Sequence, residues 1–241
     1  QGPALVVPVA VLAAAVAVPG AELADWLTTA ETRWDGGLWS AALGATLWLS
    51  AAAAVVSTLA ALPLGVLAAR HRDRATRALE GASYVAHGLP AIVIAISMVS
   101  LGVLLLRPIY QREPLLILAY AVLFVPLAVG SVRAAVESSP IRLEEVARSL
   151  GRPPVRAFTA VTARVALPGI AAGAAMVLLT CMKELPVTLL LHPTGTDTLA
   201  TRLWGYSSVS DYAAAAPYAA ALLVFAAVPT ALLGAWSVRG D

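Results

Sequence analysis

The chain has 241 residues, of which 60% are hydrophobic and 12% are charged, and its formal net charge is +2 at pH 7. In soluble globular domains about a quarter of all residues are charged, so this composition excludes an ordinary soluble domain. The apolar runs are continuous rather than alternating, which argues against a transmembrane β-barrel. The composition predicts an all-α protein that crosses a membrane several times.

Six apolar runs follow one another along the chain, within a single expected transmembrane domain over residues 1–241. A bilayer core of about 30 Å needs about 20 apolar residues per helix, so each run predicts one span. The spans are expected at about residues 3–19, 38–69, 82–106, 115–132, 170–191 and 212–236. The first run is short and could also be the core of a signal peptide, although no basic segment precedes it. Pro126 predicts a bend in the fourth span.

The arginines are unevenly distributed among the segments between these spans. Segments 70–77 and 133–164 and the C-terminus hold eleven Lys or Arg residues, against four in the segments expected on the other side. Basic residues are enriched on the cytoplasmic side of membrane proteins. The distribution therefore predicts that both termini and the long loop at 133–168 are cytoplasmic.

The first part of this long loop has the pattern of a short amphipathic helix. Pro140 suits its first helical position, because the missing N–H of proline is not needed there. Apolar residues then recur at the spacing of one helical face: Leu143, Val146, Ala147 and Leu150. Glu144 and Arg148 stand four residues apart, in the favourable order for an ion pair.

A glycine corner and a second helix are expected next. Gly151 stands where a helix can end in the left-handed conformation that glycine adopts most easily. Pro153 and Pro154 then open a helix that we expect to reach about Pro168. Two short helices around a corner, placed between membrane spans, predict a docking surface for a soluble partner. The alternative is an ordinary basic cytoplasmic loop.

Residues 145–151, Glu-Val-Ala-Arg-Ser-Leu-Gly, resemble the EAA loop of binding-protein-dependent ABC importer permeases of the MetI-like type. Val146 stands where that pattern has its first alanine, and the proline of the pattern appears only at Pro168. The resemblance implies a six-helix type I ABC importer transmembrane domain with cytoplasmic coupling helices. The ATPase-coupling residues that it implies are Glu144, Glu145, Ala147, Arg148 and Gly151.

A charged pair interrupts the fifth expected span, where Lys183 and Glu184 are followed by Pro186. One charge near the bilayer centre costs about 2.5–3.5 kcal/mol on insertion scales, so such residues usually face a bundle interior or a water-filled cavity. Pro186 has no N–H to bond to Met182, which predicts a kink. Two interpretations stay open. Lys183, Glu184 and Pro186 line the translocation pathway or its gate, or Lys183 and Glu184 form an ion pair, with each other or with another helix, that only fixes packing.

The string from Lys183 to Thr188, continued by Asp197-Thr198-Leu199-Ala200-Thr201, is similar to ferric-iron importer permeases. It is most like the second of the two homologous halves that such permeases often carry on one chain. Thiamine, sulfate, molybdate and polyamine permeases share the loop but match the rest less well, and they are the alternative substrate classes. Because the chain starts at Gln1 rather than Met, we expect half of a longer permease or a processed product.

The sequence shows no catalytic or metal-binding motif. It lacks the Gly-Lys-Ser/Thr of an ATP-binding loop, its three histidines are isolated, and Cys181 is its single cysteine. We therefore expect no enzyme, no catalytic or metal-binding residues and no cofactor bound by this chain.

The family resemblance implies a set of partners and a location in the bacterial inner (cytoplasmic) membrane, as a multi-pass protein with the N-in and C-in orientation. The implied partners are an ABC ATPase dimer that binds ATP, a second similar permease half on the same chain or another subunit, a periplasmic or lipid-anchored substrate-binding protein, and membrane lipid, with no nucleic acid. The alternative class is a secondary transporter or channel, which would also use intramembrane charge.

Overall fold

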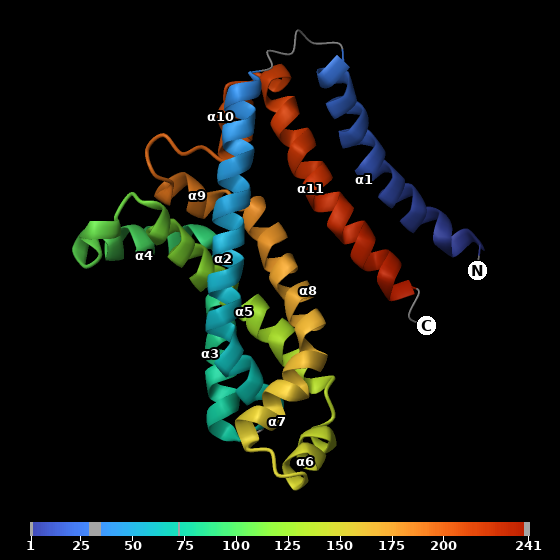
Figure 1. Cartoon of the computed structure of the whole chain (residues 1–241). Coiled ribbons are helices and arrows are strands. Elements are labelled where there is room, and N and C mark those ends of the chain that lie inside the picture. Colours follow the sequence, from blue (N-terminus) through green and yellow to red (C-terminus); the bar gives the residue numbers. More distant parts are fainter. Residues whose placement is uncertain (1, 29–34, 72, 239–241) are drawn as a thin grey trace. The chain divides into compact units, whose positions relative to one another are not determined.

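The computed structural model describes residues 2–28, 35–71 and 73–238, and all regular structure in these ranges is helical (Figure 1). The helices in chain order are α1 (Gly2–Thr28), α2 (Gly36–Arg70), α3 (Arg74–Gly88), α4 (Ala91–Leu104), the short 3₁₀ helix η1 (Arg107–Ile109), α5 (Glu113–Glu137), α6 (Ile141–Ser149), α7 (Pro154–Ala160), α8 (Thr162–Met182), α9 (Pro186–Leu191), α10 (Leu199–Ser208) and α11 (Tyr212–Val238).

Several helix boundaries differ from those expected. The run at 82–106 is divided at Leu89 and Pro90, because a residue before proline is disfavoured in helical conformation. The run at 170–191 is divided into α8 and α9. In contrast, α5 continues through Pro126 as one helix. The polar segment after α9 contains a further helix, α10, which the apolar pattern does not indicate.

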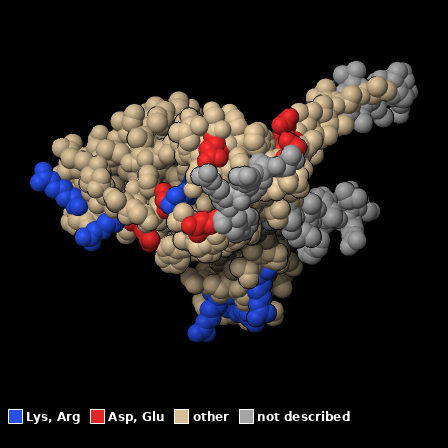
Figure 2. All heavy atoms as spheres, turned by 90° about the horizontal axis from the view of Figure 1, so that it is seen from above, with Lys and Arg blue, Asp and Glu red and all other residues tan. Residues whose placement is uncertain are grey.

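By length and composition, three of the described helices are suited to cross a bilayer, namely α2, α5 and α8. Helix α4 and residues 212–227 of α11 are apolar but shorter. Most atoms on the face shown in Figure 2 belong to uncharged residues, and the charged groups form separate patches. Six spans therefore remain a prediction, while the long apolar helices agree with an integral membrane protein.

The described residues form two compact units. Residues 46–196 make the larger one, and residues 1–45 and 197–241 contribute to the smaller one. In the smaller unit, Leu199 and Tyr218 are buried, and the rings of Trp26 and Tyr212 lie 5.6 Å apart. The hydroxyl of Thr198 accepts a hydrogen bond from the backbone N–H of Thr201 and so caps α10.

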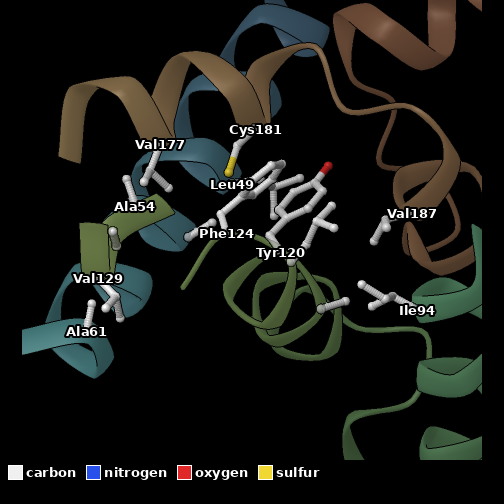
Figure 3. Close-up of a cluster of buried hydrophobic side chains, with 14 of the residues drawn as sticks. Leu49, Ala54, Ala61, Ile94, Tyr120, Phe124, Val129, Val177, Cys181 and Val187 are labelled. Atoms are coloured by element: carbon white, nitrogen blue, oxygen red, sulfur yellow. The ribbon is translucent and has the colours of Figure 1, made fainter. Parts of the chain in front are cut away.

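Helix α5 is the centre of the larger unit. Its Tyr120 and Phe124 pack with Leu49 of α2, Val177 of α8 and Val187 of α9 in one buried cluster (Figure 3). More than half of the most apolar window of α5 is buried, against about a third of that of α2. An apolar helix that is buried on most sides forms the core around which the others pack.

The contact between α5 and α8 depends on small residues. A Cβ added at Gly169 would lie 2.8 Å from the Cβ of Ala135, and one added at Gly173 would lie 2.3 Å from the Cβ of Ser131. Both distances are too short for packed carbon atoms, so no larger residue fits without movement of a helix. Glycines four residues apart allow such close approach of helices in membranes. This contact fixes the position of α8, which ends at Met182 just before the charged pair.

Candidate functional site

Helix α6 carries most of the predicted coupling residues, and it lies with α7 at one end of the larger unit (Figure 1). It begins at Ile141 rather than at Pro140. Pro140 has φ −60° and ψ 128°, an extended conformation, and so occupies the cap position before the helix. The prediction that Pro140 is the first helical residue was wrong by one position. The predicted second helix is also divided, since α7 ends at Ala160 and α8 begins at Thr162.

Gly151 forms the corner after α6, as its sequence position predicts. Its φ is +83°, in the left-handed region. The N–H of Gly151 donates to the carbonyl of Arg148 at 2.9 Å, and the N–H of Arg152 donates to the carbonyl of Ala147 at 3.2 Å. This pair of bonds is the Schellman motif, which satisfies carbonyl groups at the end of a helix. A Cβ at Gly151 would meet no atom within 4 Å, so the requirement for glycine there is conformational rather than steric.

The apolar side chains of α6 are mostly exposed to solvent. Of the predicted apolar stripe, only Ala147 is buried, whereas Leu143, Val146 and Leu150 are 47%, 56% and 78% exposed. Glu145 and Arg148 are exposed as well. An exposed apolar patch bordered by charges marks an interaction site more often than a solvated loop. We call the exposed side chains of Leu143, Glu145, Val146, Arg148 and Leu150 the α6 surface.

The spacing of Glu144 and Arg148 predicts an ion pair between them, but Glu144 instead points into the bundle. Its carboxylate lies 2.5 Å from the Nη2 of Arg70 at the end of α2 and accepts a hydrogen bond from the Thr162 hydroxyl. Arg70 also donates to the Thr162 hydroxyl at 3.1 Å and to the carbonyl of Ser139 at 3.3 Å. Thr162 and Ser139 are fully buried. We call these four residues the basal network.

The tertiary contact outcompetes the local one for a physical reason. An exposed pair four residues apart in a helix contributes about 0.3–0.5 kcal/mol. The Glu144 and Arg70 side chains retain only 17% and 14% of their exposure, so solvent screens their attraction much less. The additional hydrogen bonds to Thr162 and Ser139 offset part of the loss of hydration of the two charges, although the Nε of Arg70 is buried with no hydrogen-bond partner among the described residues.

The second predicted site lies at the break between α8 and α9. The helix is not merely kinked at Pro186, as expected, but ends at Met182 and begins again at Pro186. The carboxylate of Glu184 accepts a hydrogen bond from the backbone N–H of Val187 at 3.1 Å. Lys183 is exposed and makes no ion pair with any of the described residues, so the mutual ion pair considered above is not formed here.

A buried hydrogen-bonded chain holds this break against α5. The Tyr120 and Thr188 hydroxyl oxygens lie 2.5 Å apart, and the Thr188 hydroxyl also lies 2.5 Å from the carbonyl oxygen of Glu184. Tyr120 and Thr188 are buried. Because unpaired hydroxyl groups are costly in such surroundings, this chain favours one position of α9 relative to α5.

The structure thus separates the two predicted sites and adds residues that the sequence interpretation missed. The coupling residues lie around α6, and Lys183, Glu184 and Pro186 lie at the α8–α9 break. The missed residues are Arg70, Ser139, Thr162, Tyr120 and Thr188. Tyr120 and Thr188 could have been noticed as polar residues inside apolar runs. Nothing in the local sequence distinguishes Arg70 from the other arginines near it.

Among the residues that the structure describes, no three His, Cys, Asp or Glu side chains gather in a geometry that could hold a metal ion. Cys181 is buried in the apolar cluster (Figure 3). The side chain of His87 lies outside the described residues, and His71 is exposed.

Comparisons with known proteins give one consistent result. The family described as "Binding-protein-dependent transport system inner membrane component" matches residues 61–239. The Fe(3+)-transport system permease protein FbpB 2 of Haemophilus influenzae is 35% identical over 227 residues, which are 93% of this chain and 45% of that protein. The molybdate/tungstate transport system permease protein WtpB of Pyrococcus abyssi is 31% identical over 56% of this chain and 53% of its own length. The chain spans about half the length of these two relatives.

Solved structures show the same fold at lower sequence identity. A chain of the MetNI methionine ABC transporter, in inward-facing conformations, superposes with a TM-score of 0.69 at 19% identity and covers 84% of this chain and 95% of its own length. A chain of a bacterial ABC transporter involved in the import of the acidic polysaccharide alginate gives a TM-score of 0.63 at 20% identity, covering 98% of this chain and 94% of its own. The all-α fold is that of type I ABC importer transmembrane domains, and the chain belongs to the family of binding-protein-dependent transport system inner membrane components.

Proposed function

We propose that this chain is a transmembrane permease subunit, or half of one, in an ATP-driven importer of ferric iron. The observation that carries the proposal is the α6 surface, which presents apolar side chains and Glu145 to solvent beside a glycine corner. Such a surface suits a soluble partner that pushes on the bundle. The chain itself has no ATP-binding loop, so the ATPase dimer is a separate subunit.

The rest of the assembly follows from the family and from charge. A second similar permease half completes the pathway, and a periplasmic or lipid-anchored binding protein delivers the substrate. The basic segments at 70–77 and 133–164 are cytoplasmic, which gives the N-in and C-in orientation in the bacterial inner membrane. Closure of the ATPase dimer moves α6 as a rigid element, and the bundle alternates between its inward-open and outward-open states.

Ferric iron is the proposed substrate because the iron-permease relative matches nearly the whole chain, whereas the molybdate/tungstate relative matches 56% of it. Molybdate is the second candidate, supported by that relative and by the molybdenum transport permease ModB of Haemophilus influenzae, which is 31% identical over 52% of this chain. Iron is cargo here, and no resident metal site is proposed. Lys183, Glu184 and Pro186 are proposed to line the pathway, since α8 is interrupted there and Lys183 is exposed without an ion pair among the described residues.

The test is uptake in proteoliposomes that contain the complete transporter, with radioactive ferric iron in one arm and molybdate in the other. The proposal expects iron uptake that requires both ATP and the binding protein. Molybdate uptake would replace the substrate, and uptake without nucleotide would favour a secondary transporter. Glu184→Gln keeps the side-chain shape and should slow uptake while the complex still assembles. Unchanged uptake by this variant would remove Glu184 from the pathway.

A further inference from the structure

We propose that Arg70 and Glu144 are the positioning pair that transmits movement of α6 to α2 and α8. This proposal rests on the proposed function, because the movement that it transmits is the one driven by the ATPase. It assigns different roles to two neighbouring acidic residues. Glu145 faces the partner, whereas Glu144 faces the bundle.

The first observation is how little else holds α6 to the bundle. Among its nine residues only Ala147 is buried, and Glu144 is partly buried. The large apolar side chains of the helix, Leu143 and Val146 among them, are exposed and cannot anchor it. The helix contacts α7 and α8, and among the described residues its side-chain hydrogen bonds and ion pair with the bundle all run through the Glu144 carboxylate.

The second observation is that several segments meet at one guanidinium group. Arg70 is the last residue of α2, and it contacts the carboxylate of Glu144 in α6 at 2.5 Å. The same group reaches the Thr162 hydroxyl, at the start of α8, and the Ser139 carbonyl, in the link that follows α5. A planar guanidinium fixes the directions of its N–H donors, so it holds these segments in one relative geometry.

The third observation is the surroundings of the pair. Thr162 and Ser139 are fully buried, and their hydroxyl oxygens lie 3.5 Å apart, so one side of the pair is closed to water. In such surroundings a charged pair is directional and resists separation more than an exposed one does. A displacement of α6 is therefore passed on to the ends of α2 and α8 rather than lost in a loose hinge.

The pair predicts a specific defect, which is loss of coupling without loss of docking. Arg70→Gln removes the positive charge and the planar set of N–H donors of the guanidinium. It leaves the α6 surface intact, so the ATPase still binds. In proteoliposomes with the complete transporter, the iron transported per ATP hydrolysed should fall about fivefold or more, the scale of a typical coupling energy. Arg70→Lys keeps the charge and should fall less. The matched control is Arg74→Gln, because Arg74 is exposed four residues away, and it should leave the ratio unchanged.

A double variant separates a shared contact from two unrelated defects. Glu144→Gln should lower the ratio as Arg70→Gln does, and the two changes together should be no worse than the more damaging one alone. In addition, the amides of residues 141–149 should exchange hydrogen faster in Arg70→Gln than in Arg74→Gln, a readout that does not depend on transport.

The outcomes are distinguishable. If the wild-type complex shows no ATP-dependent uptake, the proposed function itself fails. If the wild type transports and Arg70→Gln keeps the wild-type ratio, or loses the ATPase from the complex instead, only the positioning role of this pair is wrong. Additive effects of the two glutamine substitutions would also overturn it. A variant that does not reach the membrane is judged by Arg70→Lys, whose ratio must then lie below that of the wild type.

Discussion

Two of the interruptions in the larger unit, the corner at Gly151 and the break at residues 183–185, are built in opposite ways. The corner is fixed by the backbone of one glycine and two local hydrogen bonds, and the side chains around it are exposed. The break is fixed by side chains from another helix, since Tyr120 of α5 bonds to Thr188 of α9 inside the apolar cluster. The exposed side chains at the corner can contact a partner when it binds. The break keeps its shape, because it packs in the buried core.

The difference between buried packing and the exposed corner can be tested by the same substitution at two glycines, Gly173 at the contact of α8 with α5 and Gly151 at the corner. Gly173→Ala places a Cβ 2.3 Å from the Cβ of Ser131, so α8 and α5 must move apart. We expect the free energy of unfolding to fall by about 1–3 kcal/mol, the usual effect of overpacking, measured by denaturant titration in detergent micelles. Gly44→Ala is the control, because its Cβ would meet nothing within 4 Å. A Gly173→Ala variant as stable as the wild type would contradict the close packing of these helices.

Gly151→Ala tests the other side of the comparison. The new Cβ meets no atom, so the effect comes only from a φ of +83°, which disfavours an L residue by about 1–2 kcal/mol. We expect a smaller loss of stability than in Gly173→Ala and a larger loss of uptake per ATP. Gly151→Asn should recover most of both, since asparagine adopts this conformation more readily. Equal behaviour of the alanine and asparagine variants would show that the conformation is not the reason for the glycine.

Tyr120→Phe tests whether a side-chain bond fixes the break. The change removes one buried hydrogen bond, while the Thr188 hydroxyl keeps its contact with the Glu184 carbonyl. A loss of about 0.5–1.5 kcal/mol in the free energy of unfolding is expected. Tyr84→Phe is the matched control, because Tyr84 is 45% exposed whereas Tyr120 is buried. Equal losses in the two variants would mean that the hydroxyl contact with Thr188 contributes nothing to stability.

The same contrast explains how far the sequence could predict this molecule. The Gly151 corner is encoded within a few neighbouring residues, by an amphipathic run followed by glycine, so its position was predicted and confirmed. The break at residues 183–185 was predicted only as a kink. Proline removes one hydrogen bond in either case, and whether the helix bends or ends depends on partners far away in the sequence.

A tertiary partner also explains the error at Glu144. The spacing of Glu144 and Arg148 favours a local pair, but Arg70, 74 residues away, takes the carboxylate instead. Pro126 is buried in α5, which continues through it as one helix, and the bend expected there stays a prediction. A local sequence pattern indicates which conformations and contacts a segment favours by itself, and tertiary packing determines which of them forms.

The smallest expected effect concerns another local device, at the start of α3. Asp73 precedes this helix, and its carboxylate accepts a hydrogen bond from the backbone N–H of Thr76 at 2.7 Å. This bond, together with that to the Thr76 side chain, lowers the pKa of Asp73 below its ordinary value. A carboxyl group whose pKa is lower in the folded state stabilises the fold above its unfolded pKa, and this contribution is lost as the pH falls through the folded pKa.

Wild-type protein should therefore lose thermal stability more steeply than Asp73→Asn below about pH 4, the ordinary range of an aspartate. Asparagine is a suitable control because it also caps helices but does not titrate in this range. The measurement is the midpoint of thermal unfolding in detergent between neutral pH and pH 3. Parallel curves for the two proteins would mean that the carboxylate of Asp73 does not hold the first turn of α3. In that case, local hydrogen bonds would fix the Gly151 corner but not the start of α3.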